Sequence, residues 1–106
     1  MILLNNDKWG ILLVPSNHPV LCRPDGTLSV ARCDDDKKVI YISNILKDEY
    51  LRKVLCHEIT HAVICSYNIK LDMYHEEMIA DLIASHGEEI LYNTQEYFDK
   101  INWGFI

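Results

Sequence analysis

The sequence predicts one α+β domain over residues 1–106, in which a small antiparallel sheet packs on two or three helices. Two observations lead to this fold class. Short β-rich runs separated by turn-forming residues fill residues 10–43, whereas residues 48–67 contain no Pro or Gly and repeat their apolar residues with helical period. At 49% hydrophobic content, 106 residues can bury one compact core.

The first half of the chain predicts strands. Residues 10–14 form a short apolar run that stops at Pro15, and residues 15–25 form an irregular segment that ends in a Pro-Asp-Gly turn signal. Residues 27–33 and 38–43 are β-rich and are joined by the polar residues 34–37, so they predict an antiparallel hairpin. The acidic residues of this joint lack the alternating spacing and distal Glu of a calcium loop, which favours a plain polar turn.

The second half predicts helices. Asp48 and Glu49 suit a helix N-terminus, and the following apolar stripe indicates a largely buried helix. The stripe consists of Leu51, Leu55, Ile59, Ala62 and Val63. After a turn at residues 68–73, Asp72 is the expected N-cap of a second helix.

Gly87 is expected to break or kink this second helix. Residues 88–101 then predict a third, amphipathic helix, and residues 103–106 predict either a docking tail or a frayed end. The large apolar residues expected to cover the core are Leu91, Tyr97, Phe98 and Ile101.

The most informative segment is His57-Glu58-Ile59-Thr60-His61. Because an α-helix turns about 100° per residue, His57 and His61 lie one turn apart on one face and can bind one zinc ion. Glu58 points about 100° away, so its carboxylate can act as general base on a zinc-activated water. Two His and a Glu on a buried helix need partners or a metal to be tolerated there.

A third zinc ligand is expected downstream. Glu77 and Asp81 share a face of the second helix, so one can bind zinc while the other accepts a hydrogen bond from a ligand imidazole. His75 is the rival third ligand. Glu76 is interpreted as a solvated carboxylate, and His86 as a surface residue directed away from the metal.

These two motifs resemble those of the gluzincin metallopeptidases, whose second motif, Glu-x-x-x-Asp, is here Glu77 to Asp81. Over residues 28–92 the order of elements is similar to that of the small ImmA/IrrE-type metallopeptidases of bacteria, phages and mobile elements. The resemblance implies a minimal zincin-like fold, Glu77 as third ligand and Asp81 as partner of His57. It also implies a protein or peptide substrate aligned along a sheet edge, for which residues 39–43 are the candidate strand.

The leading functional hypothesis is therefore an intracellular zinc endopeptidase that cleaves a protein substrate, with a regulatory protein as a further partner. One alternative is a non-catalytic, zinc-stabilised interaction module. Another is a different metal-assisted hydrolase, or a site that prefers another divalent ion. Tyr74 and His75 are the nearest candidates for a group that stabilises the transition state, followed by Tyr67 and Tyr92.

Composition and charge exclude several classes of partner and of cellular location. A net charge of −6 argues against binding nucleic acid or an anionic membrane through bulk charge. Polar residues split the apolar runs of the N-terminus, which predicts neither a signal peptide nor a transmembrane helix. The four cysteines show no Cys-x-x-Cys spacing and are interpreted as reduced, mostly buried thiols of a cytoplasmic protein, in preference to a Cys22–Cys33 disulfide.

Overall fold

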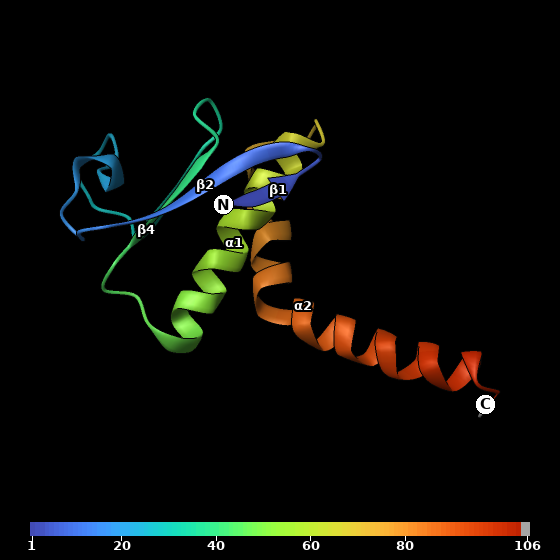
Figure 1. Cartoon of the computed structure of the whole chain (residues 1–106). Helices are drawn as coiled ribbons and strands as arrows, with labels where there is room; N and C mark the ends of the chain where they lie inside the picture. The colour runs from blue at the N-terminus through green and yellow to red at the C-terminus, as the bar shows by residue number, and fades with distance from the viewer. Residues whose placement is uncertain (105–106) are drawn as a thin grey trace.

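The computed structural model describes residues 1–104 and confirms the α+β class: a four-stranded sheet packs on the first of two helices (Figure 1). The strands are β1 (Ile2–Leu4), β2 (Asp7–Val14), β3 (Ala31–Asp34) and β4 (Val39–Ser43). A short 3-10 helix, η1 (Pro19–Leu21), lies between β2 and β3. The helices are α1 (Asp48–Ser66) and α2 (Met73–Asn102).

The sheet has the order β1-β2-β4-β3, which corrects two predictions. It is mixed rather than wholly antiparallel, because β2 pairs with β4 in parallel while the two outer pairs are antiparallel. In addition, β4 is not an edge strand, since both of its sides are hydrogen-bonded to neighbours. The edge on that side of the sheet is β3.

The predicted hairpin is confirmed, although its first arm begins at Ala31 rather than Thr27. The register pairs Ala31 with Ile42 and Asp34 with Val39. Asp34 accepts a hydrogen bond from the Lys37 backbone amide at 3.1 Å, so an aspartate of the acidic joint stabilises the turn, as expected for a polar turn.

The sheet contains a second hairpin, β1–β2, which was not predicted. Its turn is Asn5-Asn6, with φ angles of 49° and 65°. Two consecutive left-handed residues are what a two-residue type I′ turn requires, and asparagine adopts that conformation more readily than most residues. The Asn5 side chain also donates to the Ser66 carbonyl oxygen at 2.9 Å, which fastens this turn to the end of α1.

The core lies between the sheet and α1. Its fully buried members come from β2, β4, the β4–α1 loop and α1: Trp9, Ile40, Ile42, Leu46 and Ala62. The predicted apolar stripe of α1 is less buried than expected. Leu55, Ile59 and Val63 are only half-buried, and they line an open hollow of about 430 Å³ beside Ile83 of α2.

Two buried serines provide a matched test of the core's polar contacts. Trp9 is fully buried and its Nε1 donates to Ser66 Oγ at 2.8 Å. Ser43 is 1% exposed, and its Oγ has no hydrogen-bond partner within residues 1–104. We expect Ser66→Ala to lower the free energy of unfolding by about 1–3 kcal/mol, because it leaves the indole N–H unpaired. Ser43→Ala should leave the free energy of unfolding unchanged or raise it, because the Ser43 hydroxyl has no partner to lose among the described residues. Urea unfolding of both variants measures the difference, and equal losses would contradict this account.

Of the two outcomes predicted for Gly87, a break is wrong, because α2 is one continuous helix. The ribbon does change direction about midway, which agrees with the alternative of a kink, and the second half projects away from the body (Figure 1). Glycine costs a helix only about 1 kcal/mol relative to alanine, which its helical neighbours can offset. We call residues 88–103 the arm.

The prediction that arm residues cover the core is also wrong. The four side chains are more than half exposed: Leu91 71%, Tyr97 53%, Phe98 58% and Ile101 62%. The predicted tail at residues 103–106 lies partly outside the described residues; within them, Trp103 is the C-cap of α2 and is 72% exposed. The radius of gyration is 16.3 Å, whereas a compact chain of this length has about 13 Å. The arm therefore makes the molecule elongated.

Two observations bear on the setting of the chain. Within residues 1–104, neither helix combines the length and the apolar character that crossing a bilayer requires. All four cysteines are free thiols; Cys22 is exposed, which differs from its predicted burial, and the other three are half-buried.

Candidate metal centre

The site lies where the first half of α2 packs beside α1. The two helices are joined by residues 67–72, so they run antiparallel (Figure 1). Asp72 caps α2 as predicted, its carboxylate accepting from the His75 backbone amide at 2.8 Å. Glu77 lies in the second turn of this helix.

Three side chains converge on one point. Nε2 of His57 lies 3.1 Å from Nε2 of His61. The carboxylate of Glu77 reaches both rings, with 3.2 Å from Oε2 to His57 Nε2 and 2.8 Å from Oε1 to His61 Nε2. The predicted trio is therefore brought together, two members from α1 and one from α2.

The spacing of these atoms fits a zinc ion. Zinc ligands at about 2.0–2.1 Å in tetrahedral geometry lie about 3.3 Å apart, close to the 3.1 Å between the two imidazole nitrogens, and each of these nitrogens meets a different oxygen of Glu77. Two neutral imidazoles and one carboxylate are also a donor set that zinc accepts while keeping a position open for water. The residues present fit the metal that the sequence predicts.

The opposite nitrogen of each imidazole also meets a carboxylate. His57 Nδ1 lies 3.0 Å from Asp81 Oδ1, the pairing that the sequence predicts. His61 Nδ1 lies 2.5 Å from Oε2 of Glu76, whose side chain is only 23% exposed. The interpretation of Glu76 as a solvated carboxylate is therefore wrong. Both imidazoles are held with Nδ1 toward an acid and Nε2 toward the shared point, an arrangement common around metal-ligating histidines.

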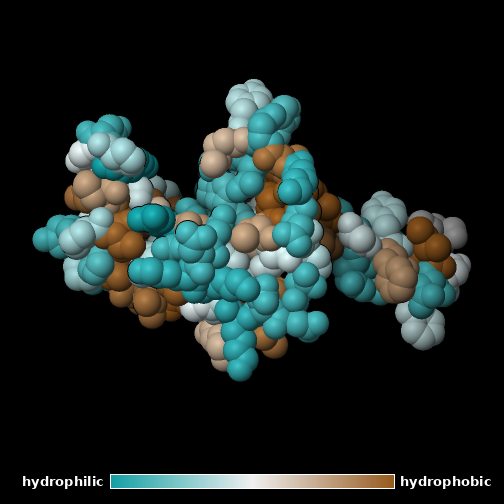
Figure 2. All heavy atoms as spheres, turned by 90° about the horizontal axis from the view of Figure 1, so that it is seen from above, coloured by the Kyte–Doolittle hydropathy of each residue, from teal (hydrophilic) through white to brown (hydrophobic). Residues whose placement is uncertain are grey.

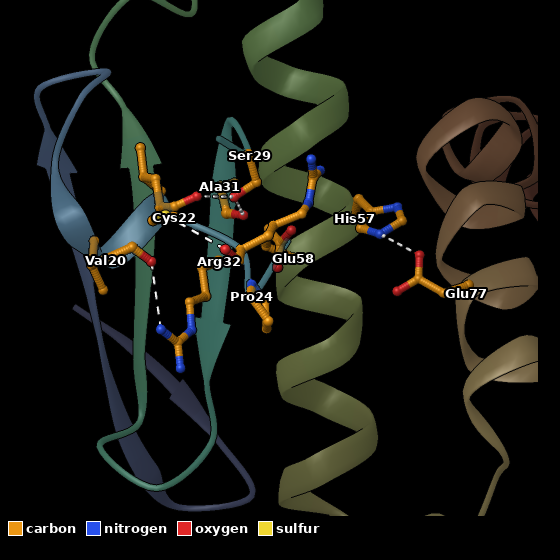
Figure 3. A pocket seen from close by; sticks show the side chains of 11 residues that line it. Val20, Cys22, Pro24, Ser29, Ala31, Arg32, His57, Glu58 and Glu77 are labelled. Carbon is orange, nitrogen blue, oxygen red and sulfur yellow. Dashed lines mark hydrogen bonds and ion pairs between the residues drawn. The ribbon is translucent and has the colours of Figure 1, made fainter. Parts of the chain in front are cut away.

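Glu58 points away from this trio, as its position in the helix predicts. In Figure 3 His57 extends toward Glu77 on α2, whereas Glu58 extends toward Ala31 and Arg32 of β3. Glu58 lines three neighbouring cavities. One of them has a volume of about 650 Å³ and is also lined by His57 and Glu77. Burial raises the pKa of Glu58; the nearby imidazoles oppose this shift, and Glu77 adds to it. The carboxylate thus faces solvent-filled space beside the trio without joining it.

The electrostatics of the site favour a cation. Burial by itself would lower the pKa of His61, but the hydrogen bond with Glu76 and the charges of Glu77 and Glu58 raise it overall. Carboxylates therefore surround the two imidazoles closely enough to favour positive charge between them. A divalent cation satisfies the same demand.

Two arginines that were not predicted as site residues line the cavity of about 650 Å³. Arg23 and Arg32 line it together with residues of η1 and β3. Arg23 is held by Thr27 Oγ1 at 3.3 Å and by the Leu28 carbonyl oxygen at 3.4 Å, and Arg32 is held by the Val20 carbonyl oxygen at 3.5 Å. No local pattern distinguishes these arginines from solvated ones, because the irregular segment that carries Arg23 returns to the site only through the fold.

The rival residues lie elsewhere. His75 is half exposed and its Nδ1 pairs with Asp72 at 2.7 Å, and the Tyr74 ring packs edge-on against it while 74% exposed. Tyr67 is 54% exposed, and Tyr92 lies on the arm, where its hydroxyl donates to Glu96. His86 is an exposed residue of α2, which confirms its interpretation as a surface residue.

The edge strand β3 lies beside Glu58. The Val30 carbonyl oxygen accepts from the Ser43 amide at 2.8 Å, so alternation along an antiparallel pair directs the backbone groups of Arg32 inward to β4 and those of Ala31 and Cys33 outward. The Ala31 carbonyl oxygen accepts from Ser29 Oγ at 2.9 Å and keeps a second lone pair.

No family model, curated protein or solved structure matches this chain. The functional conclusion therefore depends on the geometry of the site and on the resemblance of its motifs.

Proposed function

We propose that this protein is a zinc-dependent metallo-endopeptidase that hydrolyses peptide bonds of a protein substrate. The observation that supports it best is the convergence of His57, His61 and Glu77 at ligand spacing, with Glu58 beside them facing an open cavity. The resemblance of the two motifs to gluzincins of the ImmA/IrrE type supports the same reading. It also makes a cytoplasmic setting, in a bacterium or phage, and a regulatory protein partner part of the proposal.

The chain's own residues have distinct roles in this proposal. His57, His61 and Glu77 would hold the metal, and Asp81 and Glu76 orient the imidazoles. When bound, zinc lowers the pKa of a water molecule and polarises a carbonyl group. Glu58 would act as general base, accepting a proton from the attacking water and passing it to the leaving amine.

The substrate is proposed to bind as an extended strand along β3. Outward backbone groups of Ala31 and Cys33 offer pairing partners, which suits a peptide better than a sugar or a small ester. The strand lies beside Glu58 and within the wall of the cavity, so a peptide paired there would present a carbonyl group near the metal.

The direct test is cleavage profiling of the zinc-loaded full chain on a peptide library, read by mass spectrometry. Cleavage at recurring sites, abolished by a chelator and restored by zinc, is the expected result. A chain that binds one zinc yet cleaves no peptide or candidate protein would overturn the peptidase proposal.

That last outcome would favour the second candidate, a zinc-stabilised interaction module. The observation in its favour is the small core: five fully or nearly fully buried apolar residues form it, and the metal-binding residues connect α1 to α2 directly. In such a module zinc would contribute mainly to folding.

Glu76 provides a test of the orienting contacts. We expect Glu76→Ala to weaken zinc binding by about 10–100-fold, because His61 loses the acceptor that orients its ring. A competition titration with a chromophoric chelator measures the affinity. Glu96→Ala, an exposed glutamate of the arm, is the matched control and should bind zinc like the wild type. Equal affinity of the Glu76 variant would return Glu76 to the role of a surface residue.

A further inference from the structure

The arm carries an apolar face that nothing covers within the described chain. Five large side chains on it are more than half exposed: Ile90, Leu91, Tyr97, Phe98 and Ile101. At about 100° per residue they lie within a stripe about 120° wide, centred on Thr94. We call this set the arm stripe. In Figure 2 the projecting end of the molecule shows hydrophobic side chains among hydrophilic ones.

The arm stripe continues the face by which α2 packs on α1. Ala80 is fully buried, and Ala84, Gly87 and Leu91 follow it at helical spacing along the hollow between the two helices. The contact ends where α1 begins: Arg52 pairs with Glu88 at 2.6 Å, near the N-terminus of α1. Beyond this level α2 keeps the same face, and within residues 1–104 no other helix lies beside it. A helix antiparallel to α2, as α1 is, would cover this face.

We propose that this helix is the arm of a second copy of the chain, paired antiparallel about a two-fold axis near Thr94. In that arrangement Leu91 lies level with Tyr97 of the other copy, and Ile90 lies level with Phe98. Ile101 lies level with Gly87, where the absence of a side chain leaves room for it. The same residues of both copies therefore form the contact, as an isologous interface requires.

Area and charge agree with self-pairing. Five side chains at these exposures present about 500–600 Å² per copy, so two stripes would bury about 1,000–1,200 Å², near the lower limit for a specific interface. The arm stripe contains no charged residue, so the chain's net charge of −6 does not bring like charges into its centre. Antiparallel pairing also places opposite ends of the two helix dipoles together.

The experiment is sedimentation velocity on the full chain over a concentration series from about 1 to 200 μM. The wild type should form a dimer. The double variant Leu91→Glu with Phe98→Glu should weaken the dimer by about 100-fold or more, because it places two charges in the stripe. The matched control, Tyr92→Glu with Gln95→Glu, adds the same charge outside the stripe and should dimerise like the wild type. Circular dichroism checks that all three keep their helix content.

Thiol cross-linking tests the orientation in a Cys22→Ser background, which removes the exposed native thiol. Thr94→Cys should form a disulfide between copies, whereas Ile101→Cys should not, since it lies level with Gly87. Equal cross-linking at both positions would overturn the antiparallel arrangement. Self-pairing would be overturned if the wild type stayed monomeric at every concentration, or if the stripe variant dimerised like the wild type. The arm stripe would then have to bind a helix of a different protein.

Discussion

Glu77→Ala is expected to abolish stable zinc binding, with an affinity loss of about 1,000-fold, more than the 10–100-fold that removal of an orienting partner costs. The physical reason is that Glu77 supplies the one ligand that comes from α2, and its carboxylate reaches Nε2 of both His57 and His61. Without it, two imidazoles on one helix remain, which is too few for a tight site. Elemental mass spectrometry on protein purified without added metal, followed by a chelator competition titration, measures the loss.

His75→Ala is the matched control for this experiment. His75 was the rival third ligand, and its ring pairs with Asp72 at the start of α2. This variant should retain about one zinc per chain. If His75→Ala lost zinc while Glu77→Ala kept it, the ligand set would be wrong and α2 would have to rotate relative to α1.

The second large effect is expected for Glu58→Gln. Glutamine keeps the size and polarity of the side chain but cannot accept a proton, so peptide hydrolysis should fall by about 100–10,000-fold. Zinc binding should stay close to that of the wild type, because Glu58 points to β3 and not to the metal ligands (Figure 3). The ratio of kcat/KM values on a cleaved peptide, together with metal content, measures both quantities.

Two outcomes would contradict this role of Glu58. Loss of zinc from Glu58→Gln would make the residue a ligand or a structural group. Undiminished hydrolysis with zinc retained would mean that another group accepts the proton. An unfolded variant is recognised by its circular dichroism, and Glu58→Asp then tests the same role, because it keeps a carboxylate but shortens its reach.

The residues of the site could be predicted because their spacing is local. His57 and His61, like Glu77 and Asp81, are four residues apart within one helix, so backbone geometry alone places each pair on one face. Glu76 was missed because its surroundings are not local. It adjoins Glu77 in sequence, and only the packing of α2 on α1 decides that its carboxylate meets His61 rather than solvent.

The fold shows the same division. The β3–β4 hairpin and the two helices follow from local runs and turn signals. The order of strands does not follow from local sequence, so the sequence does not reveal that β4 lies inside the sheet. The β1–β2 hairpin had a signal, the Asn5-Asn6 pair between apolar residues, which was overlooked. The apolar periodicity of residues 88–101 predicts an amphipathic helix. It shows that one face of the helix needs a partner, but it does not identify that partner, so the expected contact with the core is absent.

The crowding of carboxylates at the α1–α2 contact has a consequence for the folding of the chain. Glu58, Glu76, Glu77 and Asp81 lie around two imidazoles, and residues 67–72 join the two helices nearby. With a divalent ion between them, these groups form a cross-link that closes a short loop. Without one, their mutual repulsion acts against the same contact. We therefore expect the ion to stabilise the contact between α1 and α2, so that the rigidity of this helix pair would depend on the supply of metal.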